Sequence, residues 1–355
     1  MKQKNSFSGQ IGFVFAAAGS AVGVGNLWRF PYLAAKDGGG LFLLIYLVLV
    51  LTVGFVLLTT DIAIGRKTGK SAIYAYESMQ KKWKFLGVIT FLVPVLIMTY
   101  YAVIGGWILR YIVIYLTSSG KQAVADDCFT AFISSPSSVW YGLIFMLLTA
   151  LIVYNGVEDG IERVSKFIMP VLLIMVIGIA IFSLTLKTTL DDGTVRTGLQ
   201  GLKVYMKPDL TGITVGRFLQ ITLDAMSQLF FSLSVSMGIM ITYGSYVKKD
   251  VDLNKAVSQI EIMDTGVAFL AGVMIIPAVF VFSGLDGMSA GPGLMFVSLP
   301  KVFYSMGTVG RVIGILFFVL AGFAALTSCI SVLESITANC MELFHTERKK
   351  TTRVL

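Results

Sequence analysis

Ala18-Gly-Ser-Ala-Val-Gly-Val-Gly-Asn-Leu-Trp-Arg-Phe-Pro31 lies in the middle of an apolar segment of this 355-residue sequence. The stretch holds residues that weaken a helix or carry a polar group: Gly19, Gly23, Gly25, Asn26, Arg29 and Pro31. Inside a bilayer, an interrupted helix is tolerated where the freed backbone is buried in protein or lines a cavity. Freed carbonyls can coordinate a cation, and Asn26 adds a neutral oxygen, so the stretch predicts a binding site. Glycines also mark close packing between membrane helices, and the residues alone leave this alternative open.

The composition predicts a protein that crosses a membrane several times. Hydrophobic residues make up 56% of the chain and charged residues only 14%. Apolar segments near the length of about 20 residues that spans a bilayer recur along the sequence. We expect eight spans, near 11–35, 41–65, 84–116, 139–155, 161–187, 215–246, 256–284 and 309–340.

The net charge of +8 has a distribution that argues for a membrane partner, the lipid bilayer, and against nucleic acid. Lysines and arginines gather in the short loops 66–84 and 247–255 and in a basic tail, 341–355. Cytoplasmic loops carry such an excess of basic residues. We therefore expect a multi-pass protein of the cytoplasmic membrane with both termini in the cytoplasm. The loop 285–308, rich in glycine and proline, is expected to fold over a cavity as a lid.

A second apolar segment is interrupted in the same way, at Gln228-Leu-Phe-Phe-Ser-Leu-Ser-Val-Ser-Met-Gly238. Serines in a membrane helix often bond only to their own backbone, which is the simpler alternative. However, interruptions in the first and sixth spans are what an inverted repeat of five helices produces, and they point to a transporter site. The chain is then a single membrane domain, 1–355, with a first repeat over 11–187 and an incomplete second repeat over 215–340.

Several motifs, in order along the chain, resemble the neurotransmitter:sodium symporter family and its bacterial amino-acid transporters. They are the Gly25–Pro31 run, Gly38-Gly-Gly40, Tyr100-Tyr101, Ile241-Thr-Tyr-Gly-Ser-Tyr246 and Leu326-Thr-Ser328. The resemblance implies an all-α polytopic fold of the five-plus-five inverted-repeat type, with its first and sixth helices broken mid-membrane. It also implies sodium-coupled symport of a neutral, apolar amino acid by alternating access.

The resemblance implies two sodium sites and one substrate site between them. The first sodium site would use Ala21, Asn26, Ser232 and Asp264, and the second Gly19, Val22, Ala324, Thr327 and Ser328. The substrate would contact Ala21, Val24, Gly25, Ile97, Tyr101, Phe231, Ser232, Ser234, Met237 and Val332, with the Tyr101 hydroxyl on its carboxylate. This wall carries no charge that would favour an acidic or basic side chain.

Chloride is not expected as a partner ion. Tyr46, Gln228 and Ser232 match the positions around the family's chloride, but Asp264 can supply the negative charge, and Ala268 is neutral. The alternative for Asp264 is a helix-end carboxylate that faces water. Asp61 matches an acid that braces the broken helices in relatives, and it can equally be an interfacial charge.

The resemblance also implies some of the residues that form the family's two gates. Arg29 and Gln228 would belong to an outer gate, and Lys4, Glu342 and Tyr246 to a cytoplasmic one. The family's transporters continue for three or four helices beyond the point that 348–355 resembles, so we expect a truncated gene or a partial chain, without the acidic partner of Arg29.

A non-transporting remnant, and a sensor or channel, are the competing functions, and a homo-oligomer stays open. An enzyme is not expected, because the sequence offers no nucleophile–base pair or metal cluster.

Overall fold

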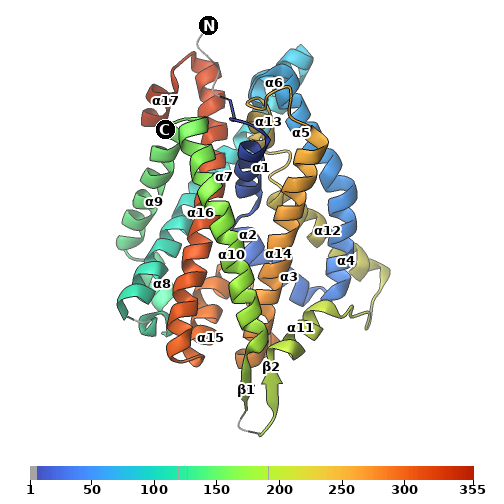
Figure 1. The fold of residues 1–355 in the computed structure, drawn as a ribbon, viewed down its shortest axis with the longest axis vertical. Helices are drawn as coiled ribbons and strands as arrows, with labels where there is room; N and C mark the ends of the chain where they lie inside the picture. The colour runs from blue at the N-terminus through green and yellow to red at the C-terminus, as the bar shows by residue number, and fades with distance from the viewer. Residues whose placement is uncertain (1–5, 119, 126, 191) are drawn as a thin grey trace.

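The computed structural model describes residues 6–118, 120–125, 127–190 and 192–355 and shows a bundle of long helices (Figure 1). Six continuous helical segments are long and apolar enough to cross a membrane. They are Gly40–Thr68 (α4 Gly40–Leu49, η1 Val50–Gly54, α5 Phe55–Thr68), Lys81–Ser118 (η2 Lys81–Trp83, α7 Lys84–Ser118), α9 (Ser137–Tyr154), Val157–Thr185 (η4 Val157–Glu162, α10 Arg163–Thr185), α14 (Leu253–Ser283) and α16 (Thr308–Phe344).

The first and sixth predicted spans are broken, as the sequence indicates. The first consists of α1 (Gln10–Ala21), α2 (Val24–Leu27) and α3 (Arg29–Lys36), and its two halves meet at a bend of 57°. The sixth consists of α12 (Val215–Ser232) and α13 (Ile239–Gly244), separated by six non-helical residues, 233–238. In that gap Ser234, Ser236 and Gly238 have φ of 52°, 60° and 74°, the left-handed region that a continuing helix never uses.

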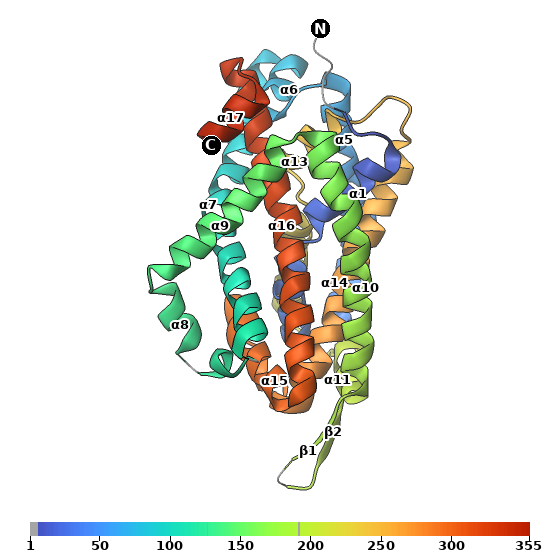
Figure 2. The ribbon, with the colours of Figure 1, turned by 60° about the vertical axis from the view of Figure 1, so that its left-hand side comes forward.

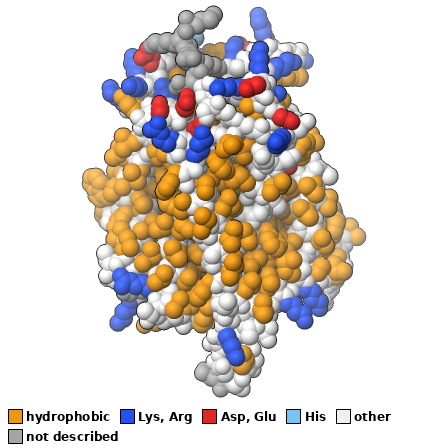
Figure 3. Space-filling view, in the orientation of Figure 1, with side chains coloured by type: hydrophobic (Ala, Val, Ile, Leu, Met, Phe, Trp, Pro, Cys, Tyr) orange, Lys and Arg blue, Asp and Glu red, His pale blue; other side chains and the backbone are white. Residues whose placement is uncertain are grey.

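The surface confirms a multi-pass membrane protein. Large apolar side chains such as Ile174, Leu223 and Ile262 are 71%, 66% and 71% exposed, on helices that form the outside of the bundle. In Figure 3 hydrophobic side chains cover the middle of the molecule, while charged side chains gather toward its two ends. Water would make such a belt costly, whereas lipid tails are as apolar as leucine.

The first described residues, before α1, and the C-terminus lie at the same end of the bundle, here named the terminal end (Figures 1 and 2). The opposite, hairpin end carries the antiparallel pair β1 (Lys187–Thr189) and β2 (Val195–Thr197) and the helix α11 (Gly198–Met206). The broken helices run through the centre, where α1 packs on α10, α14 and α16. Short elements complete the fold: α6 (Ala72–Met79), η3 (Lys121–Val124), α8 (Cys128–Ile133), η5 (Leu285–Gly287), η6 (Leu294–Ser298), α15 (Leu299–Ser305) and α17 (Arg348–Val354).

Two segments expected to be a loop and a tail contain more regular structure than their composition indicates. The segment 285–308 is largely helical, with η5, η6 and α15, and it packs through Phe296 on Trp28, Trp107 and Phe129. The segment 341–355, expected to be a basic tail, is largely helical, because α16 continues to Phe344 and α17 follows with Arg348 buried. In both segments tertiary packing of aromatic or paired groups orders residues whose composition is typical of loops.

Candidate functional site

The break in the first span brings backbone close to side chains from two other helices. Val22 and Gly23 are extended rather than helical. A Cβ built on Gly23 would lie 2.9 Å from both the Tyr101 hydroxyl and the Ser328 hydroxyl, and one on Gly25 would lie 2.9 Å from the Phe231 ring. Glycine is therefore required at both positions for this approach.

A buried cluster of oxygens stands beside this break. Asp264 on α14 is fully buried, and the Asn26 amide donates to its Oδ1 at 2.8 Å. The Ser232 hydroxyl lies 2.9 Å from both carboxylate oxygens and 3.3 Å from Asn26 Oδ1. Asp264 is thus not a helix-end residue in contact with water. The cluster joins α2, the end of α12 and α14, and Ala21 lies at the end of α1 beside the same cavity.

A second group of oxygens lies where α16 crosses α1. The Ser328 hydroxyl is 3.5 Å from the Gly19 carbonyl and 3.2 Å from the Ser20 carbonyl. The Thr327 hydroxyl donates within its own helix, to the carbonyls of Phe323 and Ala324. Of the predicted second sodium set, Gly19, Thr327 and Ser328 lie close together, because a Cβ on Gly19 would be 3.2 Å from Thr327 Cβ. Ala324 on α16 and Val22, the residue after α1, are also fully buried.

A small cavity of about 30 Å³ separates the two groups. Every predicted substrate residue except Val24 lines it: Ala21, Gly25, Ile97, Tyr101, Phe231, Ser232, Ser234, Met237 and Val332. Val24 contributes through its backbone, since its amide donates to the Tyr101 hydroxyl at 3.3 Å. Ser20, Gly23 and Ile239 also line the cavity and are absent from the sequence prediction, although their positions between predicted residues could have indicated them.

The break in the sixth span is held by a carboxylate from α5. The Ser236 amide donates to Asp61 Oδ2 at 2.7 Å, and Asp61 is 6% exposed. The interfacial alternative for Asp61 is therefore wrong in this structure. Ser234 does not simply bond to its own helix, because its hydroxyl lies 3.3 Å from the Ser20 carbonyl of α1.

Toward the hairpin end, polar contacts join the two broken helices. Arg29 donates to Gln228 Oε1 at 3.0 Å and to Ser227 Oγ at 2.9 Å, which joins α3 to α12. Among the described residues Arg29 forms no ion pair; Gln228, predicted to share the outer gate with it, is one of its neutral partners, and Ser227 is a partner that the sequence did not predict. Farther out, Arg217 pairs with Asp37 at 2.8 Å; burial raises the pKa of Asp37, and its cationic neighbours oppose that shift.

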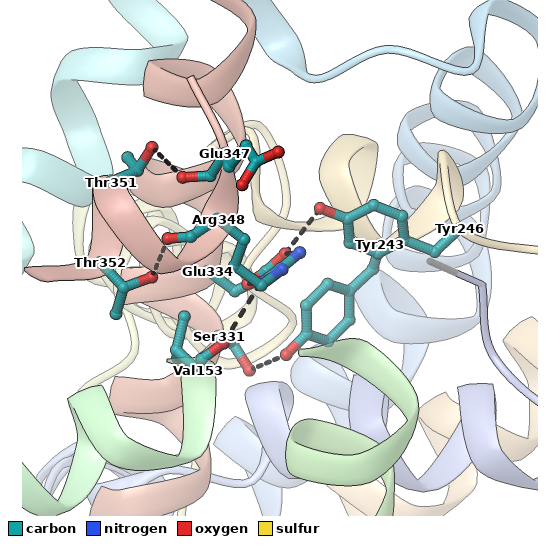
Figure 4. Close-up of polar contacts among 9 residues, drawn as sticks. All are labelled: Val153, Tyr243, Tyr246, Ser331, Glu334, Glu347, Arg348, Thr351 and Thr352. Atoms are coloured by element: carbon teal, nitrogen blue, oxygen red, sulfur yellow. Dashed lines mark hydrogen bonds and ion pairs between the residues drawn. The ribbon is translucent and has the colours of Figure 1, made fainter. Parts of the chain in front are cut away.

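At the terminal end, a buried network joins α13 to α16 and α17 (Figure 4). Tyr246 donates to Glu334 Oε1 at 2.6 Å, and Tyr243 donates to Ser331 at 2.8 Å. Arg348 binds both Glu334 oxygens, with Nη2 at 2.8 Å from Oε1. Burial alone would lower the pKa of Arg348, but the adjacent Glu334 carboxylate holds that pKa above its ordinary value.

The predicted cytoplasmic gate residues are only partly connected. Lys4 lies outside the described residues, and Glu342 accepts the Ser71 amide at 3.1 Å. Tyr246, expected to brace that gate, instead bonds Glu334 and accepts the Phe7 amide at 3.2 Å through its carbonyl. Sequence reasoning missed Glu334 and Arg348; the signal available was a lone acid deep in an apolar span, which requires a partner.

Comparisons with known proteins identify the family of the chain. The model of the sodium:neurotransmitter symporter family matches residues 4–138 and 129–355. The chain belongs to this family.

The chain is 38% identical over 352 residues to an uncharacterised sodium-dependent transporter, YhdH, of Bacillus subtilis, covering 97% of this chain and 74% of that protein. An uncharacterised sodium-dependent transporter of Methanocaldococcus jannaschii is 33% identical, over 98% of this chain and 72% of its own length.

Among solved structures, the crystal structure of MhsT in complex with L-phenylalanine matches with a TM-score of 0.85 and 38% sequence identity. The match covers 99% of this chain and 78% of that one. The fold of this symporter-family member is therefore that of MhsT, and the protein is a multi-pass membrane protein whose family is one of symporters rather than of enzymes.

Proposed function

We propose that this protein is a sodium-coupled symporter of a neutral, apolar amino acid. The observation that carries the proposal is the buried oxygen cluster of Asn26, Ser232 and Asp264 on the wall of a cavity between two broken helices. Broken helices in a transporter supply carbonyls and half-helix ends to coupling ions and anionic substrate groups. The similarity to sodium-dependent transporters, and to a protein that holds phenylalanine, supports the same reading.

In this proposal two sodium ions bind. Asn26, Ser232 and Asp264 with the Ala21 carbonyl form the first site, and the substrate carboxylate completes it. Thr327 and Ser328, with the carbonyls of Gly19, Val22 and Ala324, form the second. The present hydrogen bonds among these oxygens mark groups close enough to share an ion, since Ser328 Oγ is 3.5 Å from the Gly19 carbonyl.

The proposed substrate has an uncharged side chain because the residues that line the cavity carry no charge. The backbone amides at the start of α2 and the Tyr101 hydroxyl would bind its carboxylate, and the carbonyls near Ala21 and Ser232 its ammonium group. The side chain would lie among apolar groups such as Ile97, Met237 and Val332, all of which line the cavity. A volume of about 30 Å³ holds one or two water molecules, so Phe231 or Met237 must move to admit a substrate.

Polar contacts join the helices on both sides of the site, which is expected of one state of an alternating-access cycle. Arg29 with Gln228 would open for entry from outside, and the Tyr246–Glu334–Arg348 network would open for release into the cytoplasm. We propose that the terminal end faces the cytoplasm. Asp264 supplies a fixed negative charge, so the cycle would need no chloride.

The test is binding of radiolabelled neutral amino acids to the purified protein in nanodiscs, in sodium and in potassium. We expect binding in sodium that is lost in potassium. Asn26→Ala should raise the sodium concentration needed for half-maximal binding at least tenfold, whereas Asn155→Ala, at an exposed helix end, should not. Equal binding in the two salts would contradict the proposal.

A further inference from the structure

A large groove opens on the side of the bundle, away from the cavity described above. It has a volume of about 760 Å³ and lies between α14 and the helix of α4, η1 and α5. Rim residues include Leu44, Leu51 and Ile262, which are 56%, 66% and 71% exposed and belong to the apolar surface of the bundle. The groove therefore opens sideways toward lipid, and its volume is in the range of sites for drug-sized molecules.

The wall of this groove contains an acidic residue that does not belong to the candidate transport site. Glu261 on α14 lines the groove and is only 5% exposed. Its Oε1 has no hydrogen-bond partner among the described residues, and the same is true of the Thr265 hydroxyl one turn farther along. Unpaired polar atoms at this depth are costly, and a buried acid in a membrane span marks a functional site by default.

The residues around Glu261 indicate which charge a ligand bound in the groove would carry. No lysine or arginine lines the groove, and within the described residues Glu261 forms no ion pair. The nearest charged group on the same helix is Asp264, three residues on, which is also an acid. A cation in the groove would be attracted by both carboxyl groups, whereas an anion would be repelled.

The rest of the wall decides what kind of cation fits. Leu43, Leu47, Val50, Phe55 and Phe269 make the lining apolar. A metal ion takes several oxygen ligands, usually with more than one charged group among them, and among the described lining residues Glu261 is the only carboxylate, beside the hydroxyls of Tyr46, Ser258 and Thr265. An organic cation with an apolar chain satisfies both parts of the groove, with its ammonium group at Glu261 and Thr265 and its chain along the leucines. The lining runs along α14 from Ser258 to Phe269, about 16 Å at 1.5 Å per residue.

We propose that this groove is a binding site for a cationic amphiphile of the primary alkylamine class, held by an ion pair with Glu261. The alkyl chain gains little by leaving lipid, because lipid tails are as apolar as the groove. The head group must therefore provide the selectivity. An alkylamine should bind much more tightly than the alcohol of equal chain length.

The experiment measures saturable binding of radiolabelled dodecylamine to the protein in nanodiscs of zwitterionic lipid, with empty nanodiscs subtracted. Glu261→Gln removes the charge and keeps the shape. Gly266→Leu fills the groove, since a Cβ at Gly266 meets no atom within 4 Å, and it leaves Glu261 in place. Glu158→Gln, at an exposed glutamate, is the matched control.

We expect saturable binding by the unmodified protein and by Glu158→Gln, and at least tenfold weaker binding by Glu261→Gln and Gly266→Leu. Dodecanol should displace the amine from the unmodified protein at least tenfold less well than unlabelled dodecylamine does, a comparison that needs no variant. Binding no greater than to empty nanodiscs, binding by Glu261→Gln within twofold of the unmodified protein, or equal displacement by the alcohol would each overturn the proposal.

Discussion

Arg348 offers a sharp test of how the terminal end is held together. Its guanidinium binds both oxygens of Glu334, and the two side chains are 10% and 0% exposed. In Arg348→Met the carboxylate keeps only the Tyr246 hydroxyl at 2.6 Å. Breaking a buried pair by removing one partner costs about 3–5 kcal/mol, because the other charge is left buried. We expect Arg348→Met to lower the free energy of unfolding by about that amount.

A double-mutant cycle measures how much of this loss in unfolding free energy comes from the interaction between Arg348 and Glu334. Glu334→Gln removes the charge that Arg348 faces, and the double variant removes both. Replacing a whole buried pair by neutral groups is often close to neutral in stability. The double variant should therefore be more stable than Arg348→Met alone, with a coupling energy of up to about 3 kcal/mol between the two sites.

The assay is equilibrium unfolding of the purified protein in detergent, followed by tryptophan fluorescence. Arg353→Met, an exposed arginine on the same helix that contacts Tyr154, is the matched control and should change the unfolding free energy by about 0.5 kcal/mol or less. If the two single changes add to within about 0.5 kcal/mol, the ion pair is not coupled and the reasoning fails.

Three further predictions address the site and the packing. Ser328→Ala should raise the sodium concentration that half-saturates substrate binding, because it removes the hydroxyl near the Gly19 and Ser20 carbonyls; an unchanged sodium titration would contradict the second ion site. Replacing chloride by gluconate should leave substrate binding intact, and Asp264→Asn should make binding depend on chloride or abolish it. Gly65→Ala should destabilise the fold by about 1–3 kcal/mol, because its Cβ would fall on the Ile241 carbonyl; Gly178→Ala, with open space around it, should not, and unfolding measurements compare the two.

Much of the centre of the molecule follows from local features of the sequence. Gly23 and Gly25 predict the first break because only glycine permits backbone to approach Tyr101 and Phe231 so closely. The serines before Gly238 predict the second. Asn26 and Asp264, which are 238 residues apart, came together in the prediction only through resemblance to a family, because spacing along a chain does not encode contact between distant helices.

The features that the sequence did not predict depend on tertiary packing, which residue composition does not indicate. Arg348 lies in a run of basic residues, which is usually a solvated segment, yet Glu334 draws it into the interior. Phe296 lies in a segment rich in glycine and proline, yet its ring is stacked on Phe129 with centroids 5.0 Å apart. No pattern in the sequence indicates that Glu261 lines a groove, where its Oε1 has no hydrogen-bond partner among the described residues.

Three of the buried acids share one arrangement, and it has a mechanical consequence. Asp61, Asp264 and Glu334 lie on continuous helices, and each bonds a group from a broken one: the Ser236 amide, the Asn26 amide and the Tyr246 hydroxyl. In low dielectric such charge-assisted bonds are strong, so they fix the half-helices, which lack part of their own hydrogen bonds. An ion bound between Asn26 and Asp264 would break one of these three hydrogen bonds and leave the other two intact. We therefore expect sodium to shift the balance between arrangements of α2 at the cavity first, and to affect α13 at the terminal end only through the chain that connects α12 to it.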